Sequence, residues 1–132
     1  MCTKFFRQYS DWGFLLLRVV IGIIFIYHGS LKWGLWTATP GNMPMSMVLL
    51  FKLLSIVEPL AGLALIVGVY TEWAALILSV VMLGAIYFKI SVLHMPFAGQ
   101  SGTGWEFDLI LLAGSVVLLT SGGGSLVAMK SK

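Results

Sequence analysis

Four continuous apolar stretches dominate the sequence and restrict it to membrane folds. They cover roughly residues 13–35, 46–69, 73–93 and 104–121. Each is close to the ~20 apolar residues that a helix needs to cross ~30 Å of hydrocarbon. Polar and apolar residues do not alternate within them, which argues against the strands of a membrane β-barrel. We therefore predict an all-α fold, an integral membrane four-helix bundle that forms a single domain over residues 1–132.

Composition excludes several other classes of protein. The chain is 59% hydrophobic and only 10% charged, whereas soluble domains are about 45–50% apolar and about 25% charged. No run of basic residues forms a stripe, so we expect no nucleic-acid partner. Cys2 is the only cysteine, which excludes a disulfide scaffold and a self-contained CxxC enzyme. The expected environment is the lipid bilayer.

Charges outside the apolar stretches predict the orientation in the membrane. Basic residues flank the first and last stretches at Lys4, Arg7, Lys130 and Lys132. The connecting segments 36–45 and 95–103 contain no Lys or Arg. Because cytoplasmic segments carry the excess of Lys and Arg, both termini should be cytoplasmic in a multi-pass inner (plasma) membrane protein. The first stretch contains Arg18 and has no small-residue cleavage site, so we expect it to be retained rather than removed as a signal peptide.

Ionisable residues within the apolar stretches are predicted to gather at one depth. They are His28, Lys32, Lys52, Glu58, Lys89, Glu106 and Asp108. With ~1.5 Å of rise per residue, all seven fall within a slab ~12 Å deep in the outer half of the bilayer. A charged residue inside a span costs roughly 2.5–3.5 kcal/mol on insertion scales. The three lysines and three acids therefore predict a mutually neutralising cluster that lines the bundle interior, although snorkelling of the lysines to the interface is an alternative.

Helical phase separates some members of this cluster. His28 and Lys32 are four residues apart and share a helix face. Glu106 and Asp108 differ by about 200° around their helix, so they cannot both face one pocket. One of the two must face a neighbouring helix, a second subunit or the interface.

Glu58 is the strongest candidate for a functional carboxylate. It lies near the middle of its span, where snorkelling is not effective. It also precedes Pro59, which has no N–H and frees a backbone carbonyl one turn back. An extended Arg18, ~8 Å away in depth, is a candidate packing partner.

Small residues predict close helix packing. Gly62, together with neighbouring alanines, forms a small-residue face on the second span. Gly22 in the first span and Gly84 in the third are expected to permit the same close approach.

Three motifs, in order along residues 12–126, resemble the DoxX family. The first span carries Arg18, Gly22, His28-Gly29 and Lys32, the second Glu58-Pro59-Leu60-Ala61-Gly62, and the last Gly104-Trp105-Glu106-Phe107-Asp108, followed by Gly122-Gly123-Gly124-Ser125-Leu126. Val127 departs from the family pattern, which often has an acidic residue at that point.

The resemblance implies a four-helix inner-membrane protein, often described as an oxidoreductase subunit. The family includes subunits of a thiosulfate:quinone oxidoreductase. It also includes a member that joins a superoxide dismutase and a sulfurtransferase in a membrane complex for redox balance. Our first hypothesis is therefore a membrane subunit of a quinone-linked oxidoreductase or redox-homeostasis complex, with other membrane or peripheral subunits as partners. Whether the chain is itself catalytic stays open.

On this hypothesis the bundle holds a quinone head group. The candidate catalytic residues are His28, Glu58 and Glu106, and the candidate cofactor-binding residues are Arg18, Lys32 and Asp108. Hydrogen bonds to the quinone oxygens, with a proton acceptor beside them, are what such a reduction requires. Histidine suits the acceptor role because its unperturbed pKa lies near neutrality. No resident metal site is predicted.

Other functions remain as alternatives. The polar layer of a non-catalytic scaffold or assembly subunit would pair with the helices of a partner. A small-solute or proton transporter would use the same buried carboxylate, but so short a chain without broken-helix repeats would have to form a homo-oligomer. His28 and His94 could in number hold a haem. Met43, Met45 and Met47 with His94 could hold Cu(I), because thioethers are soft ligands.

Overall fold

The computed structural model describes residues 2–38 and 41–129, and helices dominate this part of the chain. In chain order they are α1 (Cys2–Arg7), α2 (Ser10–Ser30), the 3₁₀ helix η1 (Trp33–Trp36), α3 (Met45–Val67), α4 (Thr71–Ser91) and α5 (Trp105–Ser121). The described residues contain no strand. The all-α prediction is therefore confirmed.

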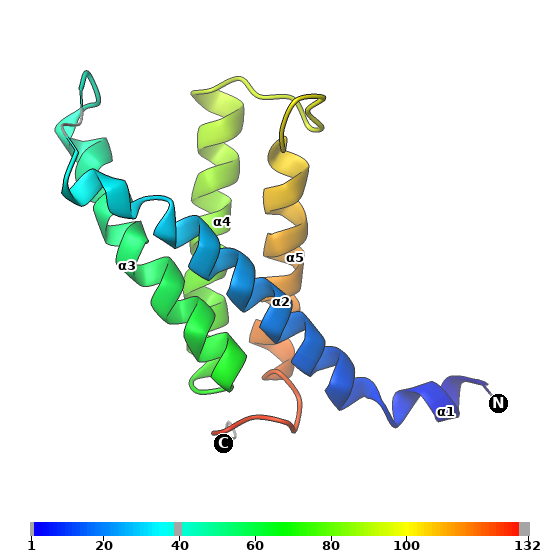
Figure 1. The fold of residues 1–132 in the computed structure, drawn as a ribbon. Helices are drawn as coiled ribbons and strands as arrows, with labels where there is room; N and C mark the ends of the chain where they lie inside the picture. The colour runs from blue at the N-terminus through cyan, green and yellow to red at the C-terminus, as the bar shows by residue number, and fades with distance from the viewer. Residues whose placement is uncertain (1, 39–40, 130–132) are drawn as a thin grey trace.

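Three segments are long and apolar enough to cross a membrane by length and composition. They are Ser10–Trp36, with 27 residues, Met45–Val67, with 23, and Thr71–Ser91, with 21. Helix α5 has 17 residues, at the lower limit of the lengths that span a bilayer, and it runs beside α4 (Figure 1). These apolar helices indicate a membrane bundle, and a fourth crossing by α5 stays a prediction.

Proline and glycine mark several helix ends. Pro44 directly precedes α3, where its missing N–H removes no intrahelical bond. Gly68 ends α3 with φ of 82° and Gly122 ends α5 with φ of 75°. Glycine adopts this left-handed conformation without the steric penalty of a Cβ.

The first helix is shorter than the sequence predicts. The predicted range 13–35 is one uninterrupted span, but α2 ends at Ser30 and the chain continues through a turn into η1. The indoles of Trp33 and Trp36 both donate to Ser55 on α3, at 2.9 and 3.0 Å. The two tryptophans thus fasten η1 to α3 across the turn.

The four long helices form two hairpins, α2 with α3 and α4 with α5 (Figure 1). Glycines let α2 and α3 cross closely, because a Cβ at Gly22 would lie 2.5 Å from the Gly62 carbonyl oxygen. The same prediction was wrong for Gly84. A Cβ at Gly84 would have no described atom within 4 Å beyond the adjoining backbone of its own helix.

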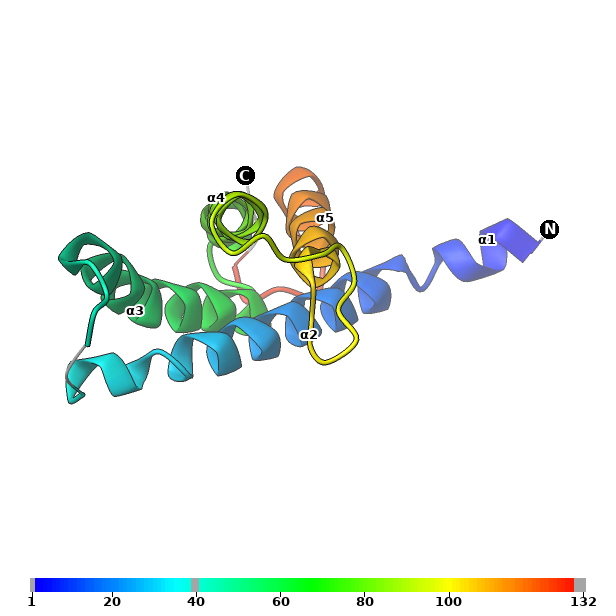
Figure 2. The same ribbon diagram turned by 90° about the horizontal axis from the view of Figure 1, so that it is seen from above.

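The hydrophobic core lies toward the end of the bundle where α1 and residues 122–129 are found, which we call the terminal end. Its fully buried members are Leu65, Ala75, Leu78 and Leu118. Toward the opposite end, which we call the loop end, α3 leans away from α4 (Figures 1 and 2). The helices are therefore tightly packed at the terminal end and spread apart at the loop end.

Residues 122–129 close the terminal end. Arg18, which is 1% exposed, donates to the carbonyl oxygens of Gly123 at 3.3 Å and Leu126 at 2.7 Å. The backbone N–H of Met129 donates to the carbonyl of Gly68 at 3.1 Å. The placement of α1 and this segment at one end agrees with a shared side for both termini. Lys130 and Lys132 lie outside the described residues, and the cytoplasmic orientation stays a prediction.

Candidate functional site

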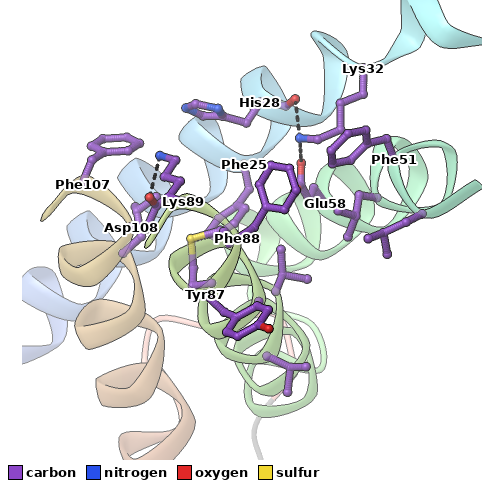
Figure 3. A pocket seen from close by; sticks show the side chains of 18 of the residues that line it. Phe25, His28, Lys32, Phe51, Glu58, Tyr87, Phe88, Lys89, Phe107 and Asp108 are labelled. Carbon is purple, nitrogen blue, oxygen red and sulfur yellow. Dashed lines mark hydrogen bonds and ion pairs between the residues drawn. The ribbon is translucent and has the colours of Figure 1, made fainter. Parts of the chain in front are cut away.

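A pocket of about 690 Å³ lies between the four long helices toward the loop end. Its ionisable side chains are His28, Lys32, Glu58, Lys89 and Asp108. The remaining lining residues are mostly apolar or aromatic. Figure 3 shows the ionisable side chains facing one another from different elements. The pocket therefore joins a polar cluster to an apolar wall.

The first ion pair joins the α2–α3 hairpin. Lys32, in the turn after α2, places its Nζ 2.7 Å from Glu58 Oε2 on α3. The same ammonium donates to the backbone carbonyl of His28 at 3.1 Å. Glu58 is 3% exposed, so its charge needs this partner. Glu58 thus holds Lys32 at the wall of the pocket.

The second ion pair joins the α4–α5 hairpin. Lys89, near the end of α4, places its Nζ 2.6 Å from Asp108 Oδ2 in the first turn of α5. Asp108 is buried and Lys89 is half-buried. Each hairpin therefore contributes one lysine and one carboxylate, and the formal charges of the two pairs cancel.

His28 lies between the two ion pairs (Figure 3). Its ring is half-buried and stands 5.6 Å, between centroids, from the ring of Phe107, at an interplanar angle of 38°. An imidazole has two ring nitrogens, so it can accept a hydrogen bond or proton at one and donate at the other. Its position between the two ion pairs makes His28 a candidate proton-transfer group of the pocket.

Aromatic side chains form much of the apolar wall. Phe25 comes from the core side of α2, and Phe107 from α5. Phe51 on α3 meets Phe88 on α4 edge to face, with 6.3 Å between the ring centroids. These rings make one side of the pocket apolar and offer flat surfaces to a planar ligand.

The structure brings together four of the six sequence-predicted site residues. His28, Lys32, Glu58 and Asp108 all line the pocket. Glu106 is exposed and does not line it. Arg18 does not line it either, and instead bonds to the backbone of residues 122–129.

Lys89 was not among the candidate catalytic or cofactor-binding residues predicted from the sequence. The signal was present, because Lys89 shares the depth of Asp108 and carries the opposite charge. The candidate pairing of Arg18 with Glu58 is not formed, since Glu58 bonds to Lys32.

Lys52 belongs to a separate cluster at the loop end. Its Nζ lies 5.2 Å from the ring centroid of Trp36, a cation–π distance. Ser55 accepts the Trp36 indole N–H and donates to the Lys52 carbonyl at 2.6 Å. This cluster positions η1. With Lys52 here and Glu106 exposed, five of the seven ionisable residues of the predicted layer line the pocket.

The pocket offers hydrogen-bond donors, acceptors and a titratable ring in a largely apolar surrounding. The two ammonium groups can donate to ligand oxygens, and the imidazole can exchange a proton with them. No group of three or more His, Cys, Asp or Glu side chains in residues 2–38 and 41–129 is arranged to hold a metal ion. The arrangement suits a neutral ligand with carbonyl or hydroxyl oxygens.

Comparison with known proteins identifies the family. The DoxX family model matches residues 13–91. The chain belongs to the DoxX family. Together with its apolar helices, this makes it a DoxX-type membrane protein.

Two relatives extend the match beyond the family model. The chain is 32% identical over 114 residues to a Bacillus subtilis protein named "Putative oxidoreductase CatD", covering 83% of this chain and 79% of the relative. It is 32% identical over 117 residues to an uncharacterized protein of Haemophilus influenzae, covering 87% of this chain and 80% of the relative. No solved structure matches this DoxX chain.

Proposed function

We propose that this DoxX-family chain is a membrane subunit of a quinone-linked oxidoreductase, and that its pocket binds the quinone head group. The observation that carries the proposal is the pocket itself. Two lysine–carboxylate pairs and an imidazole face an aromatic-lined space within a bundle of apolar helices. The oxidoreductase name of the Bacillus subtilis relative supports the reaction class.

The residues present fit a quinone. A quinone has a flat ring with carbonyl oxygens that accept hydrogen bonds, and the Lys32 and Lys89 ammonium groups are donors. Phe25 and Phe107 supply apolar surface for the ring. A bound quinone supplies an acceptor for two electrons and two protons.

The chain's own residues would orient the ring and move protons. His28 is the candidate proton-transfer group, and Glu58 holds the Lys32 ammonium against the His28 carbonyl. Asp108 holds Lys89 on the opposite hairpin in the same way. The electrons would come from a reduced sulfur compound through a partner subunit, as the family resemblance implies.

The same proposal includes location and partners. We place the chain in the plasma membrane with cytoplasmic termini, because the basic residues Lys4 and Arg7 precede the first span and the segments at the loop end have no Lys or Arg in the sequence. Other membrane or peripheral subunits would supply the electrons.

Quinone binding by two matched glutamate variants tests the proposal. Glu58→Gln removes the anion that holds Lys32, whereas Glu106→Gln makes the same chemical change at an exposed residue outside the pocket. We expect Glu58→Gln to weaken quinone binding about 10-fold, or ~1.4 kcal/mol, and Glu106→Gln to leave it within about 2-fold. Native mass spectrometry of the protein with added quinone provides the measurement.

Two results would reject the proposal. One is that the unmodified protein binds no quinone. The other is that Glu58→Gln and Glu106→Gln change binding equally, because a general effect of charge would then explain the loss.

A further inference from the structure

Helix α4 lines the pocket with two of its faces. Lys89 and Ala85 belong to the face that points toward the other helices, while Val80, Gly84 and Tyr87 also line the pocket but are exposed. The exposed three are spaced i, i+4 and i+7, so they form one stripe along the helix. The pocket therefore extends around α4 from the polar cluster to the outside of the bundle.

Helix α3 supplies the opposite wall. Met47, Phe51, Leu54 and Glu58 recur at helical spacing and all line the pocket. Glu58 is the one charged member of this stripe, and the rest are apolar. The neighbouring Leu50 also lines the pocket and is exposed. Along α3, as along α4, the lining changes from polar to apolar toward the outside.

The pocket is open between these two helices. Helices α3 and α4 are joined by a short turn at the terminal end and diverge toward the loop end in both views (Figures 1 and 2). In Figure 3, the side chain of Tyr87 points away from both ion pairs. In a membrane bundle the exposed face between two spans meets lipid, so this opening is toward the bilayer.

Gly84 lies on the exposed stripe of α4 that lines this opening. Glycine in the interior of a helix is unfavourable by roughly 0.5–1 kcal/mol relative to alanine. Gly22 and Gly62 compensate for this cost with close helix packing, but a Cβ at Gly84 would meet no described atom within 4 Å beyond the adjoining backbone of its own helix. Packing thus gives no reason for a glycine at a position that lines the pocket.

We infer that Gly84 forms a lateral portal between α3 and α4, through which the apolar tail of the bound quinone leaves the pocket for the lipid. The substrate class is therefore a lipid-soluble quinone with a long apolar tail. This inference rests on the proposed function for the head group. The portal itself stands on the amphipathic lining and on the open position of Gly84.

The test compares two leucine substitutions that add the same side chain. Gly84→Leu fills the portal, and Gly13→Leu adds leucine at another helical glycine whose Cβ position is equally open and lies outside the pocket. Each variant is measured by native mass spectrometry with two probes, a benzoquinone bearing a decyl tail and the same ring without the tail.

We expect Gly84→Leu to weaken binding of the tailed quinone at least about 10-fold while changing binding of the tail-less ring by less than about 3-fold. Gly13→Leu should change neither. Equal losses for the two probes would overturn the portal, because the added side chain would then obstruct the ring itself. Unchanged binding of both probes would overturn it as well.

A second probe separates the portal from the quinone hypothesis. An alkyl diazirine without a quinone ring should label Leu54 and Val81, which are half-buried in the pocket wall, in the unmodified protein and in Gly13→Leu. Labelling should be lost in Gly84→Leu. If the protein binds no quinone but this pattern is seen, the proposed function fails and the portal stands. Equal labelling in all three proteins, or in none of them, overturns the portal.

Discussion

Pro59 determines the hydrogen bonding of Ser55, one turn before it on α3. Proline has no N–H, so the carbonyl of Ser55 loses its intrahelical partner. The indole N–H of Trp33 donates to this carbonyl at 2.9 Å. The sequence predicts the free carbonyl, but its donor comes from beyond the end of another helix, and only tertiary packing determines that contact.

Replacing Trp33 with phenylalanine should loosen η1. Trp33→Phe keeps an aromatic ring but removes the donor to Ser55, and we expect a loss of about 1 kcal/mol in stability, typical of one hydrogen bond. Amide hydrogen exchange in residues 31–36 should become faster. Trp12→Phe is the control, because Trp12 is exposed on α2 far from η1. Equal exchange in the two variants would contradict the role of the indole bond.

Neutralising Asp108 while Lys89 keeps its charge should destabilise the protein. Asp108→Asn leaves Lys89 without its carboxylate, and breaking a buried pair costs about 3–5 kcal/mol, reduced here because the Lys89 side chain is 21% exposed. We expect a clear drop in the thermal unfolding temperature of the detergent-solubilised protein. The double variant Lys89→Met/Asp108→Leu removes both charges and should recover most of the loss. A double variant less stable than Asp108→Asn would contradict this account.

The pocket was only partly predictable from the sequence. Depth along each helix follows from residue number, so the predicted layer of seven residues includes all five ionisable residues of the pocket. It also includes Lys52 and Glu106, which lie outside the pocket. The partners of these residues depend on how each helix is rotated about its axis. Helix α5 is apolar on nearly all sides, so the distribution of apolar residues does not predict how the helix is rotated about its axis. The structure was needed to decide which of Glu106 and Asp108 faces the pocket.

At the scale of helices, two glycines in similar apolar surroundings have opposite roles. Gly22 permits the close crossing of α2 and α3, and Gly84 lines an opening. Sequence alone treats them alike, because both are single glycines within apolar spans. The distinction arises from what the neighbouring helix presents at each position.

Alanine at these two glycines should change stability in opposite directions. Gly22→Ala places a Cβ 2.5 Å from the Gly62 carbonyl oxygen, and overpacking of this kind costs about 1–3 kcal/mol. Gly84→Ala meets open space and should gain about 0.5–1 kcal/mol from helix propensity. Thermal unfolding of the two variants in the same detergent is the measurement. Similar shifts in both would contradict the distinction.

The sequence predicted where the helices lie better than it predicted where a helix is interrupted. The apolar stretches 46–69, 73–93 and 104–121 correspond to α3, α4 and α5, whose ends differ from the predicted ranges by about two residues. The break after Ser30 was not predicted. Just beyond it, the indoles of Trp33 and Trp36 bond to Ser55 on α3, and no local pattern near residue 30 predicts those contacts.

At the scale of the whole molecule, Arg18 fastens residues 122–129 to the terminal end. Arg18→Met removes both bonds to the Gly123 and Leu126 carbonyls. We expect amide exchange in residues 123–129 to become at least about 10-fold faster, because an arginine–carbonyl contact of this kind contributes about 1.5–3 kcal/mol. Exchange within α4 should stay unchanged. Equally faster exchange throughout the bundle would show that Arg18 supports the fold as a whole.

The placement of the two ion pairs also has a consequence for biogenesis. Lys32 meets Glu58 within the first hairpin, and Lys89 meets Asp108 within the second. Neither hairpin needs the other to neutralise these buried charges. During synthesis, each hairpin can therefore leave the translocon with its own lysine–carboxylate pair formed. To pair Lys32 with Glu58, the first hairpin need not wait at the insertion machinery for helices that the ribosome has not yet made.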